Sequence, residues 1–204
     1  MPLIQEHKAI FLHIPKTGGT SVERFFKVTG DNMDNLWMNR NYNIIKDAKK
    51  ITSAPQHYPL SIVHEKRPDV CDWFTFTIIR HPYQRILSEY FWRNNRGDNR
   101  GKFRFIEDDF NDWLNNKLKF VNDHSMPQSW FIDKRCHLIL RQEKLKEEIE
   151  KYLFPILKIN RQFIQINNQT LNKYYPNQEE LSQETKDNIY MKYMDDFKRF
   201  GFKR

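Results

Sequence analysis

A strand that runs straight into a glycine turn and then a helix is the feature that most constrains this chain. Residues 8–21 read KAIFLHIPKTGGTS, and the apolar stretch Ala9–Ile14 is typical of a buried strand. Val22, Phe25 and Phe26 follow at helical spacing. Glycines let the main chain approach an anion closely, and the first N–H groups of a helix point toward it. The segment therefore predicts a phosphate-binding loop.

This loop differs from a Walker A loop. Lys16 precedes both Gly18 and Gly19, whereas the Walker A lysine follows the second glycine and stands directly before Ser or Thr. Lys16 can supply a mobile positive charge, and the hydroxyls of Thr20 and Ser21 can act as donors. The alternative interpretation is a tight strand-to-helix turn that carries a solvated lysine.

A second segment, residues 73–92, reads WFTFTIIRHPYQRILSEYFW. Its aromatic and β-branched start predicts a strand over 73–79, and Pro82 suits the first turn of a helix. Arg80 stands where the strand ends, and its planar guanidinium can bind a phosphate through two parallel hydrogen bonds. Together with the hydroxyl of Ser88 it predicts a second phosphate site. The alternatives are a strand-end ion pair and an ordinary helix-surface serine.

Together the two segments resemble the nucleotide-binding signature of sulfotransferases that use 3′-phosphoadenosine 5′-phosphosulfate (PAPS). The resemblance is to carbohydrate O-sulfotransferases, such as the heparan sulfate 2-O and 6-O enzymes and their small bacterial counterparts. HIPKTGGTS is similar to the loop that holds the 5′-phosphosulfate, and RHPYQRILSEY to the segment that holds the 3′-phosphate. The resemblance implies the first role for Lys16, Thr17, Gly18, Gly19, Thr20 and Ser21, and the second for Arg80 and Ser88. NDHSMPQSWF, residues 122–131, also resembles a family segment.

Transfer to a hydroxyl needs a general base, and a histidine with a pKa near neutral serves this purpose. His57, in APQHYPL, resembles the histidine that supplies the base in carbohydrate sulfotransferases, although Gln56 stands where relatives often have glycine. The resemblance thus implies His57 as base and Lys16 as the cation that stabilises the departing phosphate. His64 is the second candidate for the base, and His124 is a candidate for positioning the substrate.

The order of expected elements predicts an α/β fold in one domain over residues 1–204. We expect a mainly parallel central sheet flanked by helices, the P-loop-like nucleotide-binding fold of sulfotransferases, with ligands at the carboxyl ends of the strands. The expected strands are 8–14, 60–64, 73–79 and 136–140, and the expected helices are 20–28, 82–93, 110–118, 143–153 and 178–200, with a partly helical stretch at 43–50.

Charge favours anionic partners. The formal net charge is +8, from 34 Lys and Arg against 26 Asp and Glu. A nucleotide co-substrate and a glycan acceptor both fit, and we do not expect nucleic acid. Two alternatives remain: a nucleotide-dependent kinase with an atypical loop, and a basic nucleic-acid-binding module without catalysis. The kinase would lack Walker A and an evident magnesium-holding carboxylate after the strand at 73–79.

No metal site is expected, because the chain has neither HExxH nor CxxC. No run approaches the roughly twenty apolar residues of a membrane-spanning helix, so we expect no transmembrane segment. With the resemblance, this predicts a cytoplasmic protein of bacterial or viral type rather than a trimmed catalytic domain of a Golgi enzyme.

Overall fold

The computed structural model describes residues 2–28, 55–119, 124–164 and 175–204. It divides into two compact units. The first comprises Met1–Arg80 and Val121–Ile166, and the second comprises His81–Phe120 and Asn167–Arg204. Each unit is described by itself below. The single domain over residues 1–204 stays a prediction, and the expected helical stretch at 43–50 lies outside the described residues.

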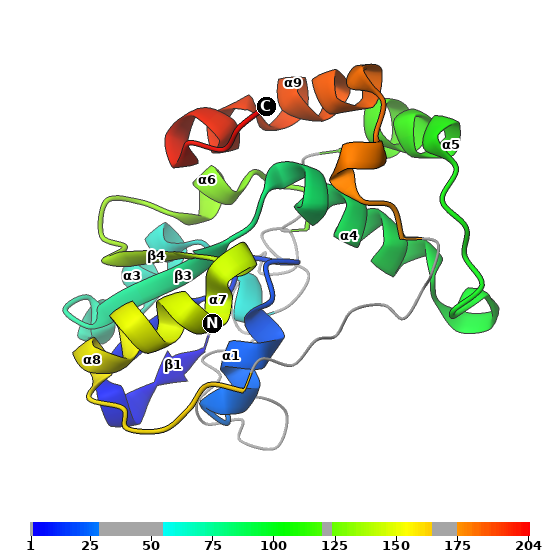
Figure 1. Cartoon of the computed structure of the whole chain (residues 1–204). Helices are drawn as coiled ribbons and strands as arrows, with labels where there is room; N and C mark the ends of the chain where they lie inside the picture. Colours follow the sequence, from blue (N-terminus) through cyan, green and yellow to red (C-terminus); the bar gives the residue numbers. More distant parts are fainter. Residues whose placement is uncertain (1, 29–54, 120–123, 165–174) are drawn as a thin grey trace. The chain divides into compact units, whose positions relative to one another are not determined.

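The described part of the first unit contains a four-stranded sheet in the order β1-β2-β3-β4. The strands are β1 (Leu3–Ile4), β2 (Ala9–Leu12), β3 (Phe74–Ile79) and β4 (Leu138–Arg141). β1 pairs antiparallel with β2, whereas the β2–β3 and β3–β4 pairs are parallel (Figure 1). The α/β fold with a mainly parallel sheet is therefore confirmed, and the strands expected at 8–14, 73–79 and 136–140 are present with shifted ends.

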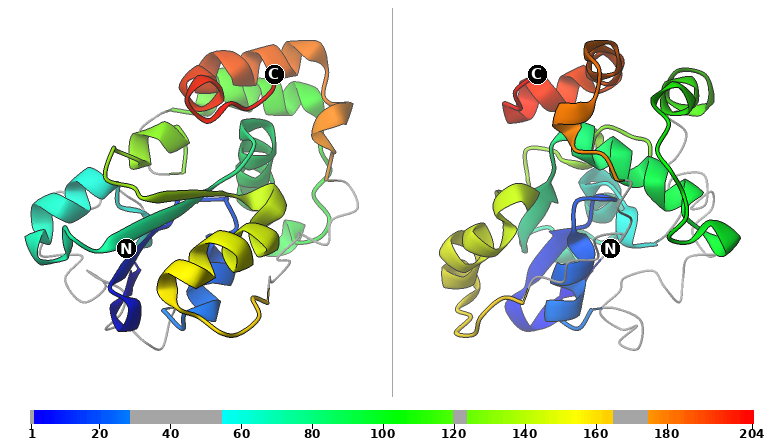
Figure 2. Two further views of the ribbon diagram at one scale, coloured as in Figure 1. Left: turned by 60° about the vertical axis from the view of Figure 1, so that its left-hand side comes forward. Right: turned by 45° about the vertical axis from the view of Figure 1, so that its right-hand side comes forward.

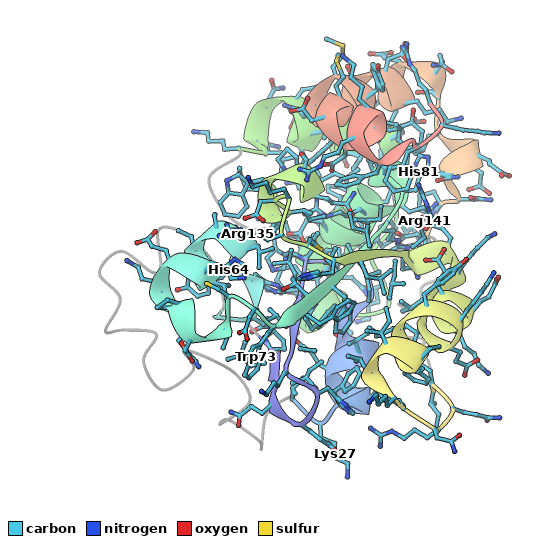
Figure 3. All side chains as sticks on the ribbon, turned by 90° about the vertical axis from the view of Figure 1, so that its left-hand side faces the viewer. Lys27, His64, Trp73, His81, Arg135 and Arg141 are labelled. Carbon is cyan, nitrogen blue, oxygen red and sulfur yellow. The ribbon has the colours of Figure 1, made fainter. Side chains whose placement is uncertain are left out.

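Helices cover both faces of this sheet, as Figure 3 shows, with α3 on one side and α1, α7 and α8 on the other. β2 and nearly all of β3 are buried on both faces, as is typical of parallel strands, whereas Ile139 of β4 is exposed. The helices and helical turns of the unit are α1 (Gly19–Phe25), Pro55–His57, α3 (Leu60–Lys66), Pro68–Val70, α6 (Gln128–Phe131), Gln142–Lys144, α7 (Leu145–Glu148), Ile149–Leu153 and α8 (Phe154–Leu157).

The main core lies between the sheet and the face covered by α1, α7 and α8. Phe11 and Phe76 project from neighbouring strands into this core, where they pack with Val22 of α1 and are inaccessible to solvent. Figure 2 shows α8 beside α1, and Phe25 stacks on Phe154 between them at 5.1 Å. This packing anchors the helix that follows the glycine turn.

The prediction of a strand at 60–64 is wrong, because this segment belongs to the helix α3. Leu60, Val63 and His64 are buried, whereas Ser61 and Glu65 are exposed. Burial at positions i, i+3 and i+4 is the pattern of a helix that packs one face on a core. His64 therefore lies in the last turn of a helix, and not at the end of a strand.

The second unit is helical in its described residues. Its helices and helical turns are α4 (Pro82–Asn94), Gly97–Asn99, α5 (Glu107–Asp112), Trp113–Lys117, Gln178–Glu180 and α9 (Gln183–Phe200). Residues from α4, α5 and α9, among them Ile86, Phe110 and Ile189, form its core. The helix expected at 82–93 is confirmed, and the last helix begins later than expected, after the Ser182 cap. Within the described residues, no helix is long and apolar enough to cross a membrane.

Candidate functional site

The loop that follows β2 turns through two residues with left-handed backbone. Gly18 has φ +89° and caps α1, a conformation that glycine adopts without steric cost. Lys16 has φ +67°, which costs a residue with a side chain about 1–2 kcal/mol. The hydroxyl of the buried Thr17 donates to the carbonyl of Ile14 at 2.9 Å and so closes the turn. This hydrogen bond therefore stabilises the loop.

Gly19 is required because the ring of His13 lies directly against it. A Cβ at Gly19 would lie 2.3 Å from both Cδ2 and Nε2 of His13. The His13 ring is buried, its Nδ1 lies 2.6 Å from Glu23 Oε1, and it stacks on Phe11 at 5.4 Å. Sequence reasoning missed Glu23. The feature of the sequence that could have indicated Glu23 is a carboxylate beside the apolar Val22, on a helix expected to pack on the core.

Arg80 follows the last residue of β3 and reaches the loop. Its Nη1 donates to the carbonyl of Lys16 at 3.3 Å, while its Nε is buried and has no hydrogen-bond partner among the described residues. The main chain of Arg80 is held by Gln128, whose Oε1 accepts from the Arg80 N–H at 2.8 Å and whose Nε2 donates to its carbonyl at 2.9 Å. Sequence reasoning assigned no role to Gln128.

His57 joins the same edge of the sheet from the turn before α3. Its Nδ1 lies 2.8 Å from the carbonyl of His13, so this nitrogen carries the hydrogen and Nε2 is left as the acceptor. The rings of His13 and His124 lie 4.6 and 5.3 Å from the His57 ring. Burial lowers the pKa of His57 well below its usual value, and nearby His13 lowers it further. His57 is therefore neutral near neutral pH.

The remaining predicted residues lie in different surroundings. Thr20 is half-buried and Ser21 is buried at the start of α1, where the Ser21 N–H donates to the Gly18 carbonyl at 3.2 Å. Ser88 is half-buried on α4, in the second unit. The structure thus brings the loop, Arg80 and His57 together in the first unit, and the part of Ser88 in phosphate binding stays a prediction.

His64 lies in a different place from His57. Its ring is buried, and neither ring nitrogen has a hydrogen-bond partner in the described residues. Burial lowers the pKa of His64. This pKa also responds to electrostatic interactions with Arg135, which is labelled beside His64 in Figure 3, and with Asp133 and His137. His137 Nδ1 accepts from the N–H of Thr75 near the beginning of β3. His64 is therefore associated with the amino ends of β3 and β4, opposite the loop.

Across the described ranges, no group of three or more His, Cys, Asp or Glu side chains is arranged to hold a metal ion.

Comparison with known proteins agrees with this geometry. The sulfotransferase family model matches residues 3–203, nearly the whole chain, so the chain belongs to the sulfotransferase family. No curated protein and no solved structure matches it. Membership implies sulfuryl transfer and, with it, a nucleotide co-substrate and an acceptor. The likeness to the heparan sulfate enzymes in particular stays a prediction.

Proposed function

We propose that this protein transfers a sulfuryl group from PAPS to a hydroxyl of a saccharide. One observation carries the proposal: Arg80 Nη1 donates to the Lys16 carbonyl at 3.3 Å. The two segments that resemble the PAPS signature thus meet, because the parallel strands β2 and β3 end at the same edge of the sheet. Ligands bind at this edge in open α/β sheets.

The residues present fit a nucleotide with two phosphates. Gly18 is exposed in the loop, whereas Gly19 is buried, with the ring of His13 in the place where its side chain would lie. Lys16 adds a cation, and the buried Nε of Arg80 is a donor without a partner among the described residues. PAPS, when bound, supplies the sulfuryl group and a phosphate as leaving group. Lys16 and the loop N–H groups would hold the 5′ end, and Arg80 with Ser88 the 3′-phosphate.

His57 is the base that the geometry supports. Its neutral form presents Nε2 as a proton acceptor, while Nδ1–H on the His13 carbonyl fixes the ring and the tautomer. When His57 takes the proton of the saccharide hydroxyl, its ring becomes an imidazolium. The His13 carbonyl stabilises this cation and so partly offsets the cost of burying its charge. Lys16 would neutralise charge on the leaving oxygen. His64 is associated with the opposite edge of the sheet, which favours His57.

The saccharide acceptor rests on the resemblance to carbohydrate sulfotransferases and on the formal charge of +8, which suits an anionic glycan. A cytoplasmic location belongs to the same proposal, and it is tested by fractionating cells that express the protein.

Nucleotide binding is tested first. Thermal unfolding is measured alone and with 3′,5′-phosphoadenosine, AMP, or ATP with magnesium. A ligand at a hundred times its dissociation constant stabilises the protein by about 2.7 kcal/mol. We expect a shift with 3′,5′-phosphoadenosine that Arg80→Ala reduces and Arg67→Ala retains, since Arg67 pairs with Asp69. An equal shift with ATP and magnesium would favour the kinase, and no shift with 3′,5′-phosphoadenosine would contradict the proposal.

Transfer is tested with PAPS labelled in its sulfuryl group and a panel of neutral and uronate-bearing saccharides. We expect label in a saccharide with the wild type, strong loss with His57→Ala, and retention with His64→Leu. Retention of full activity in His57→Ala would exclude this histidine as the base. Label in protein or oligonucleotide, but in no saccharide, would contradict the acceptor class.

A further inference from the structure

Gln128 lies in the family-like segment 122–131, to which the proposed function gives no task. Its side chain is completely buried at the beginning of α6. A buried amide needs partners for both its donor and its acceptor. Gln128 uses one of each on the same residue, Arg80, which lies 48 positions away in the chain.

The two hydrogen bonds imitate a neighbouring strand. The β3–β4 ladder ends at the pair Ile79 and Arg141, so Arg80 is the first residue beyond it. A glutamine amide carries the same donor and acceptor as a peptide group. With Oε1 on the Arg80 N–H at 2.8 Å and Nε2 on its carbonyl at 2.9 Å, Gln128 satisfies both main-chain groups at this point.

The direction of the Arg80 side chain depends on this main-chain position. From it, the guanidinium reaches the Lys16 carbonyl at 3.3 Å. Lys16 has the left-handed backbone of the loop, φ +67°, so a donor on its carbonyl helps to hold the turn. A continuous set of hydrogen bonds thus runs from Gln128 through Arg80 to the loop.

We infer that Gln128 is a positioning residue that presents the Arg80 guanidinium to the bound nucleotide and to the phosphate loop. The inference rests on the proposed function, because it assumes that Arg80 binds the nucleotide. A purely structural role, in which Gln128 only attaches α6 to β3, predicts a loss of stability that is independent of the Arg80 side chain. The two roles are separated by a double-mutant cycle.

The measured quantity is the dissociation constant of 3′,5′-phosphoadenosine by titration calorimetry. Gln128→Met keeps the length of the side chain and removes both hydrogen bonds, so we expect affinity to fall about tenfold. In an Arg80→Ala background the same substitution is expected to change affinity by less than about twofold. Gln162→Met makes the same chemical change at an exposed glutamine of the same unit and serves as the matched control.

Equal losses of affinity in both backgrounds would overturn the inference, and so would wild-type affinity in Gln128→Met. If Gln128→Met does not fold, Gln128→Glu takes its place. Gln128→Glu retains an acceptor for the Arg80 N–H and loses the donor to the Arg80 carbonyl. It should therefore weaken binding when the Arg80 side chain is present, and not in the Arg80→Ala background. Failure of the wild type to bind 3′,5′-phosphoadenosine would instead refute the proposed function.

Discussion

Alanine at Gly19 would place a methyl group where the His13 ring already lies. The added Cβ would be 2.3 Å from the ring, and a real Cβ atom essentially never lies within 3.0 Å of a non-bonded heavy atom. The ring cannot move freely, because Glu23, Phe11 and His57 contact it. Overpacking of this kind costs about 1–3 kcal/mol, and a weakened bond to Glu23 adds about 1–2 kcal/mol.

Part of this cost is offset, because alanine is better than glycine within a helix by up to about 1 kcal/mol. We therefore expect Gly19→Ala to lower the free energy of unfolding by about 3 kcal/mol, the middle of a range of roughly 1–5 kcal/mol. Gly18→Ala meets only ordinary contacts, the nearest at 3.4 Å, but must adopt φ +89°. Its strain of about 1–2 kcal/mol is reduced by the lower entropy of the unfolded chain, which leaves about 1 kcal/mol.

The assay is urea unfolding of the wild type, both alanine variants, and Gly19→Ala in a His13→Ala background. Removing the ring should rescue Gly19→Ala, so that its cost there falls below about 0.5 kcal/mol. The reasoning is refuted if Gly19→Ala costs no more than Gly18→Ala. It is also refuted if its full cost persists without the His13 ring.

Three further predictions concern the histidines and the loop. His57→Ala should lower turnover by about 10²–10⁴-fold while the affinity for 3′,5′-phosphoadenosine changes less than about twofold. Because the pKa of His57 is lowered, the rate of the wild type should begin to fall only when the pH drops below 6.5. A fall that begins above pH 6.5 would contradict the assignment of His57 as the base. The pKa of His64 is also lowered by burial, so the unfolded state binds more protons and stability should fall as pH drops below 6.5. His64→Leu should reduce that fall between about pH 8 and pH 5, measured by urea unfolding, and a steeper fall would refute the reasoning. Thr17→Val removes the bond to the Ile14 carbonyl and should cost about 1 kcal/mol in the same assay, whereas an unchanged stability would mean that this bond does not brace the loop.

Local physical chemistry explains why part of the site could be predicted. An apolar run, left-handed Gly18 and helical spacing after it define the strand, turn and helix within a few residues, and the structure has them as β2, the loop and α1. The same holds for Arg80, because β3 ends at Ile79 and Pro82 begins α4. The prediction of a strand at 60–64 failed because the local signals there are ambiguous. This short apolar run is compatible with the period of a strand and with that of a helix, and packing makes it helical.

The sequence by itself determined the elements and the residue types that a phosphate loop needs, since backbone preference and apolar periodicity are encoded within one turn or strand. Only the tertiary structure decided which groups meet. Gln128 forms hydrogen bonds with the main chain of Arg80. The His13 ring lies against Gly19 and within hydrogen-bond distance of Glu23, and the His13 carbonyl orients His57. A side-chain amide or imidazole can bond to almost any main-chain group. Its partner is chosen by the packing that places segments far apart in the chain at one edge of the sheet.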